Sequence, residues 1–82
     1  MTAQQLRAIH QARPFRPFTI VMGDGAEHHV GHPEFLSMSP SGRIAVVHRS
    51  DEAISILDLL LMTELRIEPS DLPPPNGAPP KV

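Results

Sequence analysis

Three histidines lie close together in the sequence, at His28, His29 and His32. Imidazole nitrogens are common metal ligands, and a metal site needs two or three of them to converge on one point. Neighbouring residues of a β-strand point to opposite faces, so only one of His28 and His29 could join His32. Because no third ligand is evident, we expect these histidines to lie in solvent or at a rim, without a metal or other cofactor.

The nine carboxylates are scattered along the chain rather than paired. Hydrolytic acid–base chemistry needs two carboxylates, or a carboxylate and a histidine, held together in a rigid pocket. The sequence also has no Gly-rich phosphate loop, no nucleophile elbow and no His-Glu-x-x-His motif. We therefore do not expect an enzyme.

Arg7, Arg13 and Arg16 form the only concentration of positive charge, next to Phe15 and Phe18. Arginines beside aromatic rings can bind single-stranded nucleic acid through phosphate contacts and base stacking. The whole chain has seven Lys and Arg against nine Asp and Glu, without the basic surplus that is typical of nucleic-acid binders. We therefore favour rings that anchor the helix to the sheet, with solvated arginines, over a nucleic-acid site.

The most apolar stretch of the chain runs from residue 57 to residue 62. A small core has room for only part of it, and exposed apolar patches usually mark association sites. The predicted association surface comprises Leu57, Leu59, Leu60, Leu61 and Met62, or the sheet edge next to them. We expect it to bind a second copy of the chain, with a different protein partner as the other possibility.

The 82 residues are enough for one domain, which we place at residues 1–68. Residues 69–82 hold six of the ten prolines and few apolar side chains, so we expect a disordered tail there. The sequence has no cysteine, which excludes disulfides and thiolate zinc sites. Without a span of about 20 apolar residues or a signal-like start, a cytoplasmic protein away from membranes is expected.

The domain is predicted to be mostly β, with one short leading helix. Thr2 and Gln5 fit a capping box, and Pro14 ends the helix. Six short strands follow, at residues 18–22, 27–30, 35–39, 43–48, 53–57 and 62–67. Asp58 resembles the cap of a single helical turn before the last strand. The predicted core comprises Phe18, Ile20, Val46, Ile56 and Leu65, and adjacent strands are expected to pair into a curved antiparallel sheet or small barrel.

Three segments resemble a group of short, uncharacterised bacterial proteins. They are the Arg-Pro-Phe-Arg-Pro-Phe start at residues 13–18, the Asp24-Gly25 turn and the His-Pro-Glu-Phe segment at residues 32–35. An Ile-Asp-Leu ending is usual in that group, and residues 56–65 look like a variant of it. The resemblance implies a bacterial origin and no assigned activity.

The expected order of elements resembles a second family, the Sm-like RNA chaperones, which share an SH3-like barrel and assemble into rings. Those proteins read uridine with polar residues in the turn before the last strand. Here that turn is Asp58-Leu59-Leu60-Leu61, so the RNA site is not carried over. The leading hypothesis is a non-enzymatic, self-associating interaction or regulatory module. An Sm-like RNA-binding ring is the alternative, and a small enzyme is the third.

Overall fold

The chain is described here from a computed structural model, which covers residues 2–67. The tail expected to be disordered, at residues 69–82, lies outside the described residues. Helix α1 (Ala3–His10) begins at the predicted capping box. The Thr2 hydroxyl accepts a hydrogen bond from the Gln5 backbone N–H at 3.2 Å, and the Gln5 side chain accepts one from the Thr2 N–H at 3.1 Å.

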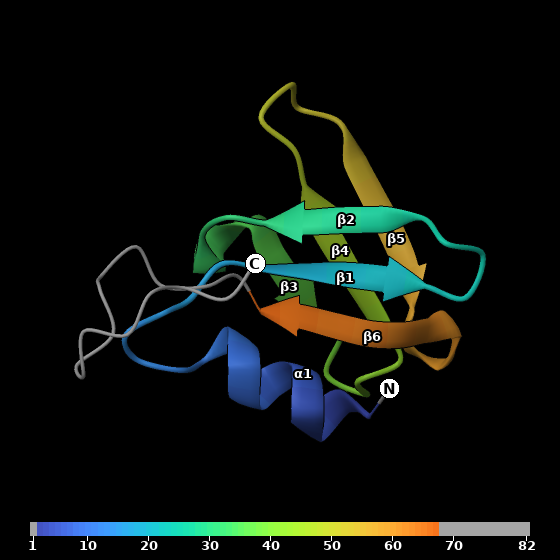
Figure 1. Cartoon of the computed structure of the whole chain (residues 1–82), viewed down its shortest axis with the longest axis horizontal. Helices are drawn as coiled ribbons and strands as arrows, with labels where there is room; N and C mark the ends of the chain where they lie inside the picture. The colour runs from blue at the N-terminus through green and yellow to red at the C-terminus, as the bar shows by residue number, and fades with distance from the viewer. Residues whose placement is uncertain (1, 68–82) are drawn as a thin grey trace, which may run out of the picture.

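Six strands form two antiparallel three-stranded sheets, which Figure 1 shows as two layers whose strands cross. Sheet 1 has the order β2-β1-β6, with bounds β1 (Phe18–Met22), β2 (Glu27–Val30) and β6 (Met62–Ile67). Sheet 2 has the order β3-β4-β5, with bounds β3 (Leu36–Met38), β4 (Ile44–His48) and β5 (Ile54–Asp58). The mostly β prediction with one short helix is confirmed.

Two short 3₁₀ turns carry the chain between the sheets. The first, η1 (Pro33–Phe35), leads from β2 to β3, and the second, η2 (Leu59–Leu61), leads from β5 back to β6. Strands on either side of these turns do not pair with each other, which corrects the expected pairing of all adjacent strands. Instead β6 pairs with β1, and within residues 2–67 the sheets do not close into a barrel.

The core lies between the two sheets. Sheet 1 contributes Phe18, Ile20 and Val30, which have no exposed surface, and α1 adds Leu6. The remaining buried apolar residues come from sheet 2, from η2 and from the start of β6: Leu36, Ala45, Val47, Leu57, Leu59 and Met62. The predicted core positions Phe18 and Ile20 are confirmed, and Leu65 is half-buried against the cluster.

The predicted burial of Val46 and Ile56 is wrong. Ile56 is 66% exposed and Val46 only half-buried, whereas their neighbours Val47 and Leu57 are buried. Side chains alternate between the faces of a strand, so a shift of one residue reverses which face is buried. In β4 and β5 the more apolar phase points outward, and this phase remains exposed in the single chain.

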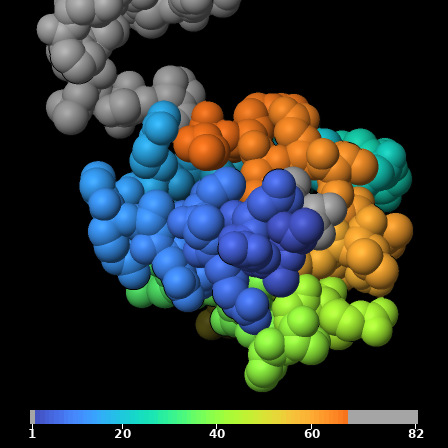
Figure 2. All heavy atoms as spheres, turned by 90° about the horizontal axis from the view of Figure 1, so that it is seen from below, coloured from blue at the N-terminus to red at the C-terminus, as the bar shows by residue number. Residues whose placement is uncertain are grey.

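Helix α1 covers one end of the sandwich, between β6 and the β3–β4 turn (Figure 2). The Arg7 guanidinium donates hydrogen bonds to the carbonyls of Ser39 at 3.3 Å and Pro40 at 3.2 Å. The ring of His10 lies 2.6 Å from the Pro33 carbonyl, which joins the helix to η1. Side-chain hydrogen bonds therefore hold the helix to the segments before and after β3, in addition to the burial of Leu6 in the core.

Candidate functional site

The outer face of sheet 2 carries exposed β-branched apolar side chains. Ile44, Ile54 and Ile56 are each at least 45% exposed, and Val46 lies among them. The register places Val46 opposite Ile56, with Ile54 opposite His48 and Ile44 opposite Asp58. We call Ile44, Val46, Ile54 and Ile56 the isoleucine face. Exposed apolar patches of this kind usually mark an interface.

The isoleucine face ends at β5, which is an edge strand of sheet 2. Hydrogen bonds run from the Leu59 N–H to the Arg43 carbonyl and from the Arg49 N–H to the Ala53 carbonyl. In an antiparallel pair such bonds recur at every second residue. The backbone groups of Ile54 and Ile56 therefore point away from β4, toward the open edge.

Protection of the four sheet edges differs among the described residues. Proteins usually guard open edges with charged side chains or by keeping the strand short. The edge strand β2 carries Glu27, the edge strand β6 carries Glu64 and Arg66, and β3 is only three residues long. From residue 54 to residue 57 the strand β5 has no charge. β5 is thus the least guarded edge.

The structure divides the predicted association surface into buried and exposed members. Leu57, Leu59 and Met62 belong to the core. Leu60 and Leu61 are 74% and 61% exposed, because η2 directs them outward just beyond the end of β5. The predicted cap is confirmed, since the Asp58 carboxylate accepts a hydrogen bond from the Leu60 N–H at 2.9 Å. Of the predicted set, only these two exposed leucines remain as candidate contact residues.

The structure does not gather the three predicted basic residues into one free patch. Arg7 binds the β3–β4 turn, as described above, and Arg13 donates to the Ala12 carbonyl at 2.8 Å. Arg16 is exposed. The Phe18 ring is fully buried, with the half-buried Phe15 ring centred 5.9 Å away, so Phe18 offers no surface for base stacking. Nucleic-acid binding at this position stays a prediction.

We expect Arg7→Gln to lower the free energy of unfolding by about 1–2 kcal/mol, because two carbonyls lose a charged donor. Arg13→Gln is the matched control, since its exposed side chain donates to the carbonyl of the adjacent residue, and it should change stability by less than about 0.5 kcal/mol. Urea unfolding followed by circular dichroism measures both, and equal losses would contradict the anchoring role.

The histidines separate in a way that the sequence does not indicate. His28 and His29 lie on opposite faces of β2, as predicted, while His32 packs edge-on against Phe35 at 5.4 Å. His48, from β4, joins the pair from β2 at a cleft of about 400 Å³, called the histidine cleft below. Its lining residues are Glu27, His28, His29, Gly31, Phe35, Val47, His48, Arg49 and Ser50. Because β2 and β4 belong to different sheets, no sequence spacing predicts this meeting.

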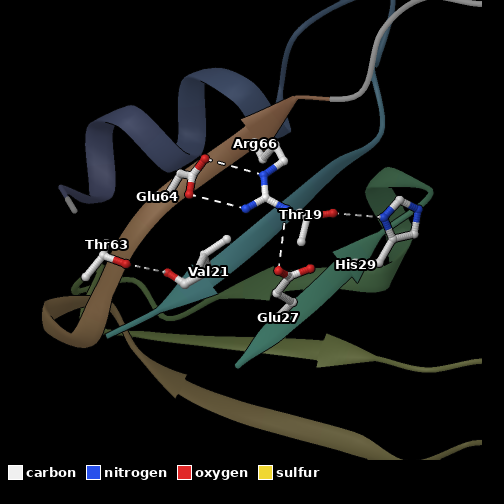
Figure 3. A network of polar contacts seen from close by, with 7 residues as sticks. All are labelled: Thr19, Val21, Glu27, His29, Thr63, Glu64 and Arg66. Carbon is white, nitrogen blue, oxygen red and sulfur yellow. Dashed lines mark hydrogen bonds and ion pairs between the residues drawn. The ribbon is translucent and has the colours of Figure 1, made fainter. Parts of the chain in front are cut away.

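The outer face of sheet 1 is a solvated polar surface (Figure 3). Arg66 contacts Glu64 and Glu27 at 3.4 Å, so it links β6 to β2 across β1. Hydrogen bonding to Glu64, aided by the charges of both carboxylates, raises the pKa of Arg66 above the ordinary value of an arginine. On the same face the Thr19 hydroxyl lies 3.3 Å from His29 Nδ1. These pairs leave Glu64 and Glu27 engaged with a cation rather than facing each other.

Within residues 2–67, no group of three or more His, Cys, Asp or Glu side chains is placed to hold a metal ion. In that same part of the chain no helix is long and apolar enough to cross a membrane. Comparisons with protein-family models, with curated proteins and with solved structures found no match.

Proposed function

We propose that this protein is a non-enzymatic interaction or regulatory module of the bacterial cytoplasm that binds a second copy of itself through β5. The observation that carries the proposal is an edge strand, without charge from residue 54 to residue 57, beside the isoleucine face. The segments at residues 13–18 and 32–35, which resemble bacterial proteins, support the bacterial setting.

A second copy fits this edge because the edge is self-complementary. Two β5 strands related by a two-fold axis pair antiparallel and extend sheet 2 into one six-stranded sheet. Pairing centred on Ile56 uses the outward backbone groups of both copies and places Val46, Ile56, Ile56 and Val46 in one row. In the neighbouring rows, Asp58 of one copy lies directly opposite Ile54 of the other, and His48 of that other copy follows one strand further along. Cross-strand apolar pairs such as those in the row of Val46 and Ile56 stabilise a sheet by about 0.2–1 kcal/mol each.

The test is Ile56→Lys. In the single chain this side chain is 66% exposed, so a lysine there should fold normally. In the paired state two ammonium groups would lie side by side, and we expect the dissociation constant to rise at least tenfold. Sedimentation velocity between about 10 and 500 μM measures the effect. Leu60→Lys, at the end of the same edge, should weaken association less.

Ala8→Lys on the exposed side of α1 is the matched control, because it adds the same charge far from β5. It should leave the mass in solution unchanged. A monomer for the unmodified protein at several hundred micromolar would overturn the proposal. Equal weakening by the lysines at positions 8 and 56 would indicate a general charge effect and would also contradict it.

A ring of Sm-like subunits that binds RNA is the second candidate. The leading helix α1 and the single turn η2 before β6 favour it, because the resemblance rests on this order of elements. The turn itself offers Asp58 and three leucines rather than lysine or histidine. The ring requires a mass of more than two subunits and binding to oligouridine that falls steeply with salt. A dimer that does not bind oligouridine at low salt would exclude the RNA-binding ring.

A further inference from the structure

Pairing through β5 leaves most of the isoleucine face uncovered. The two β5 strands meet edge to edge, whereas the side chains of Ile44, Ile54 and Ile56 project out of the plane of sheet 2. Each of these three side chains is at least 45% exposed in the single chain. In the six-stranded sheet the isoleucine faces of the two copies join across the two-fold axis. Pairing therefore turns two small apolar faces into one continuous face.

The joined face has the size of a binding surface. It spans four strands at a spacing of about 4.8 Å and five residues at about 3.4 Å each, or roughly 19 by 17 Å. All eight β-branched apolar side chains of the two copies lie within this area. Contiguous apolar patches of this size are uncommon on isolated proteins and usually mark a site of association. We therefore expect a further partner to cover the joined face.

The charges on the joined face suit a second copy of the same face. The central row is uncharged and consists of Val46, Ile56, Ile56 and Val46. Each outer row consists of Ile44 and Asp58 from one copy, followed by Ile54 and His48 from the other. A two-fold axis in the plane of the sheet lays one outer row on another in reverse order. Asp58 then faces Ile54 and His48 faces Ile44, so like charges do not meet.

Two joined faces can pack like the two layers of a β-sandwich. Such layers lie about 10 Å apart with their strands crossing at about 30°, and the side chains of both inner faces interdigitate. Isoleucine and valine are suited to this packing because their branched side chains have few rotamers to lose. The Asp58 carboxylate, which caps the Leu60 N–H, lies at the end of the strand and thus at the rim of the contact.

We infer that two β5-paired dimers pack through their joined isoleucine faces into a tetramer. The inference rests on the proposed pairing through β5 and adds a second interface to it. The tetramer has three mutually perpendicular two-fold axes, one through each β5 pair and two between the layers. This symmetry is closed, so assembly stops at four copies.

Ile44→Lys separates the two interfaces. Ile44 lies on β4, the central strand of sheet 2, and its neighbour on β5 is Asp58. A lysine there can lie beside Asp58 in the single chain and in the pair, whereas in the tetramer it would be buried between two sheets. We expect the dissociation constant of two pairs to rise at least tenfold and that of two copies to change less than twofold. Sedimentation equilibrium between about 10 and 500 μM measures both constants.

Val21→Lys is the matched control, because Val21 lies on the central strand of sheet 1 between Glu27 and Glu64. It should leave both dissociation constants unchanged. Ile44→Thr keeps the branched shape with less apolar surface, and it should weaken the association of pairs less than Ile44→Lys does. The melting temperature of each variant, measured at a concentration where the unmodified protein is a dimer, shows whether it folds normally.

A species of four copies that Ile44→Lys converts into dimers would support the inference. An unmodified protein that remains a dimer at 500 μM would overturn the tetramer and leave the pairing through β5 intact. A monomer at that concentration would overturn both. Direct conversion of tetramers into monomers by Ile44→Lys would also contradict the inference, because β5 pairing would then not persist without the layer contact.

Discussion

Phe18→Ala is expected to lower the free energy of unfolding by about 3–5 kcal/mol. The ring has no exposed surface and sits on the central strand of sheet 1, where β2 and β6 flank it on either side. Removing the ring leaves a cavity between the two sheets, which can close only partly. Domains of this size are marginally stable, so the variant should be largely unfolded at 25 °C. Urea unfolding by circular dichroism gives the loss.

Two companion variants make this result interpretable. Phe18→Leu removes less volume and should leave a folded protein with a measurably lower urea midpoint. Ile56→Ala removes an equally apolar side chain from the exposed face of β5 and should cost less than about 1 kcal/mol in the single chain. Comparable losses at positions 18 and 56 would mean that the burial of β5 is the reverse of that described here.

Gly42→Ala is expected to have the second large effect, a loss of about 2–5 kcal/mol. Gly42 has a φ of +75°, and an added Cβ would lie 2.5 Å from the Cβ of Ala3 in α1. The left-handed backbone costs about 1–2 kcal/mol for a residue with a side chain. The collision with the helix adds about 1–3 kcal/mol, since neither backbone can move freely.

Gly25 separates these two contributions. Its φ is +89°, but an added Cβ would meet nothing within 4 Å, so Gly25→Ala should show the backbone cost alone. The double variant Ala3→Gly with Gly42→Ala should recover part of the loss, because it removes the colliding methyl group. Equal losses at positions 25 and 42, with no recovery in the double variant, would contradict the close packing of α1 on the β3–β4 turn.

Features governed by neighbouring residues could be predicted from the sequence. The capping box of Thr2 and Gln5 and the cap at Asp58 each need only side chains within three residues, and both are present. Local hydrogen-bond chemistry does not depend on how the sheets pack, which is why these predictions hold.

The strand phase in sheet 2 could not be predicted in the same way. Sequence reasoning assigns the more apolar phase of a strand to the core, and this holds in β1, where Phe18 and Ile20 are buried. In β4 and β5 the buried phase includes Ala45 and Ser55, while the exposed phase contains Ile44, Ile54 and Ile56. The association of copies proposed above would bury these isoleucines, and the sequence of one chain does not distinguish burial in a core from burial in an interface.

The histidine cleft was missed for a different reason. It depends on the packing of β2 against β4, which are neither adjacent in sequence nor hydrogen-bonded to each other. The His28 and His29 pair attracts attention, but His48 is isolated in the sequence. Only the crossing of the two sheets brings His48 and its neighbour Arg49 to the same cleft as His28 and His29.

The pairing of the first strand with the last has a consequence for synthesis on the ribosome. Phe18 pairs with Ile67, so β1 lacks one of its two neighbours until 49 further residues have been added. At about 5–20 residues per second, this delay lasts several seconds. Sheet 2, in contrast, is complete once Asp58 has been made, because its strands follow one another directly. In a nascent chain one hydrogen-bonding edge of β1 therefore stays unpaired for longer than the inner edges of sheet 2, and a chaperone has this interval in which to bind that edge.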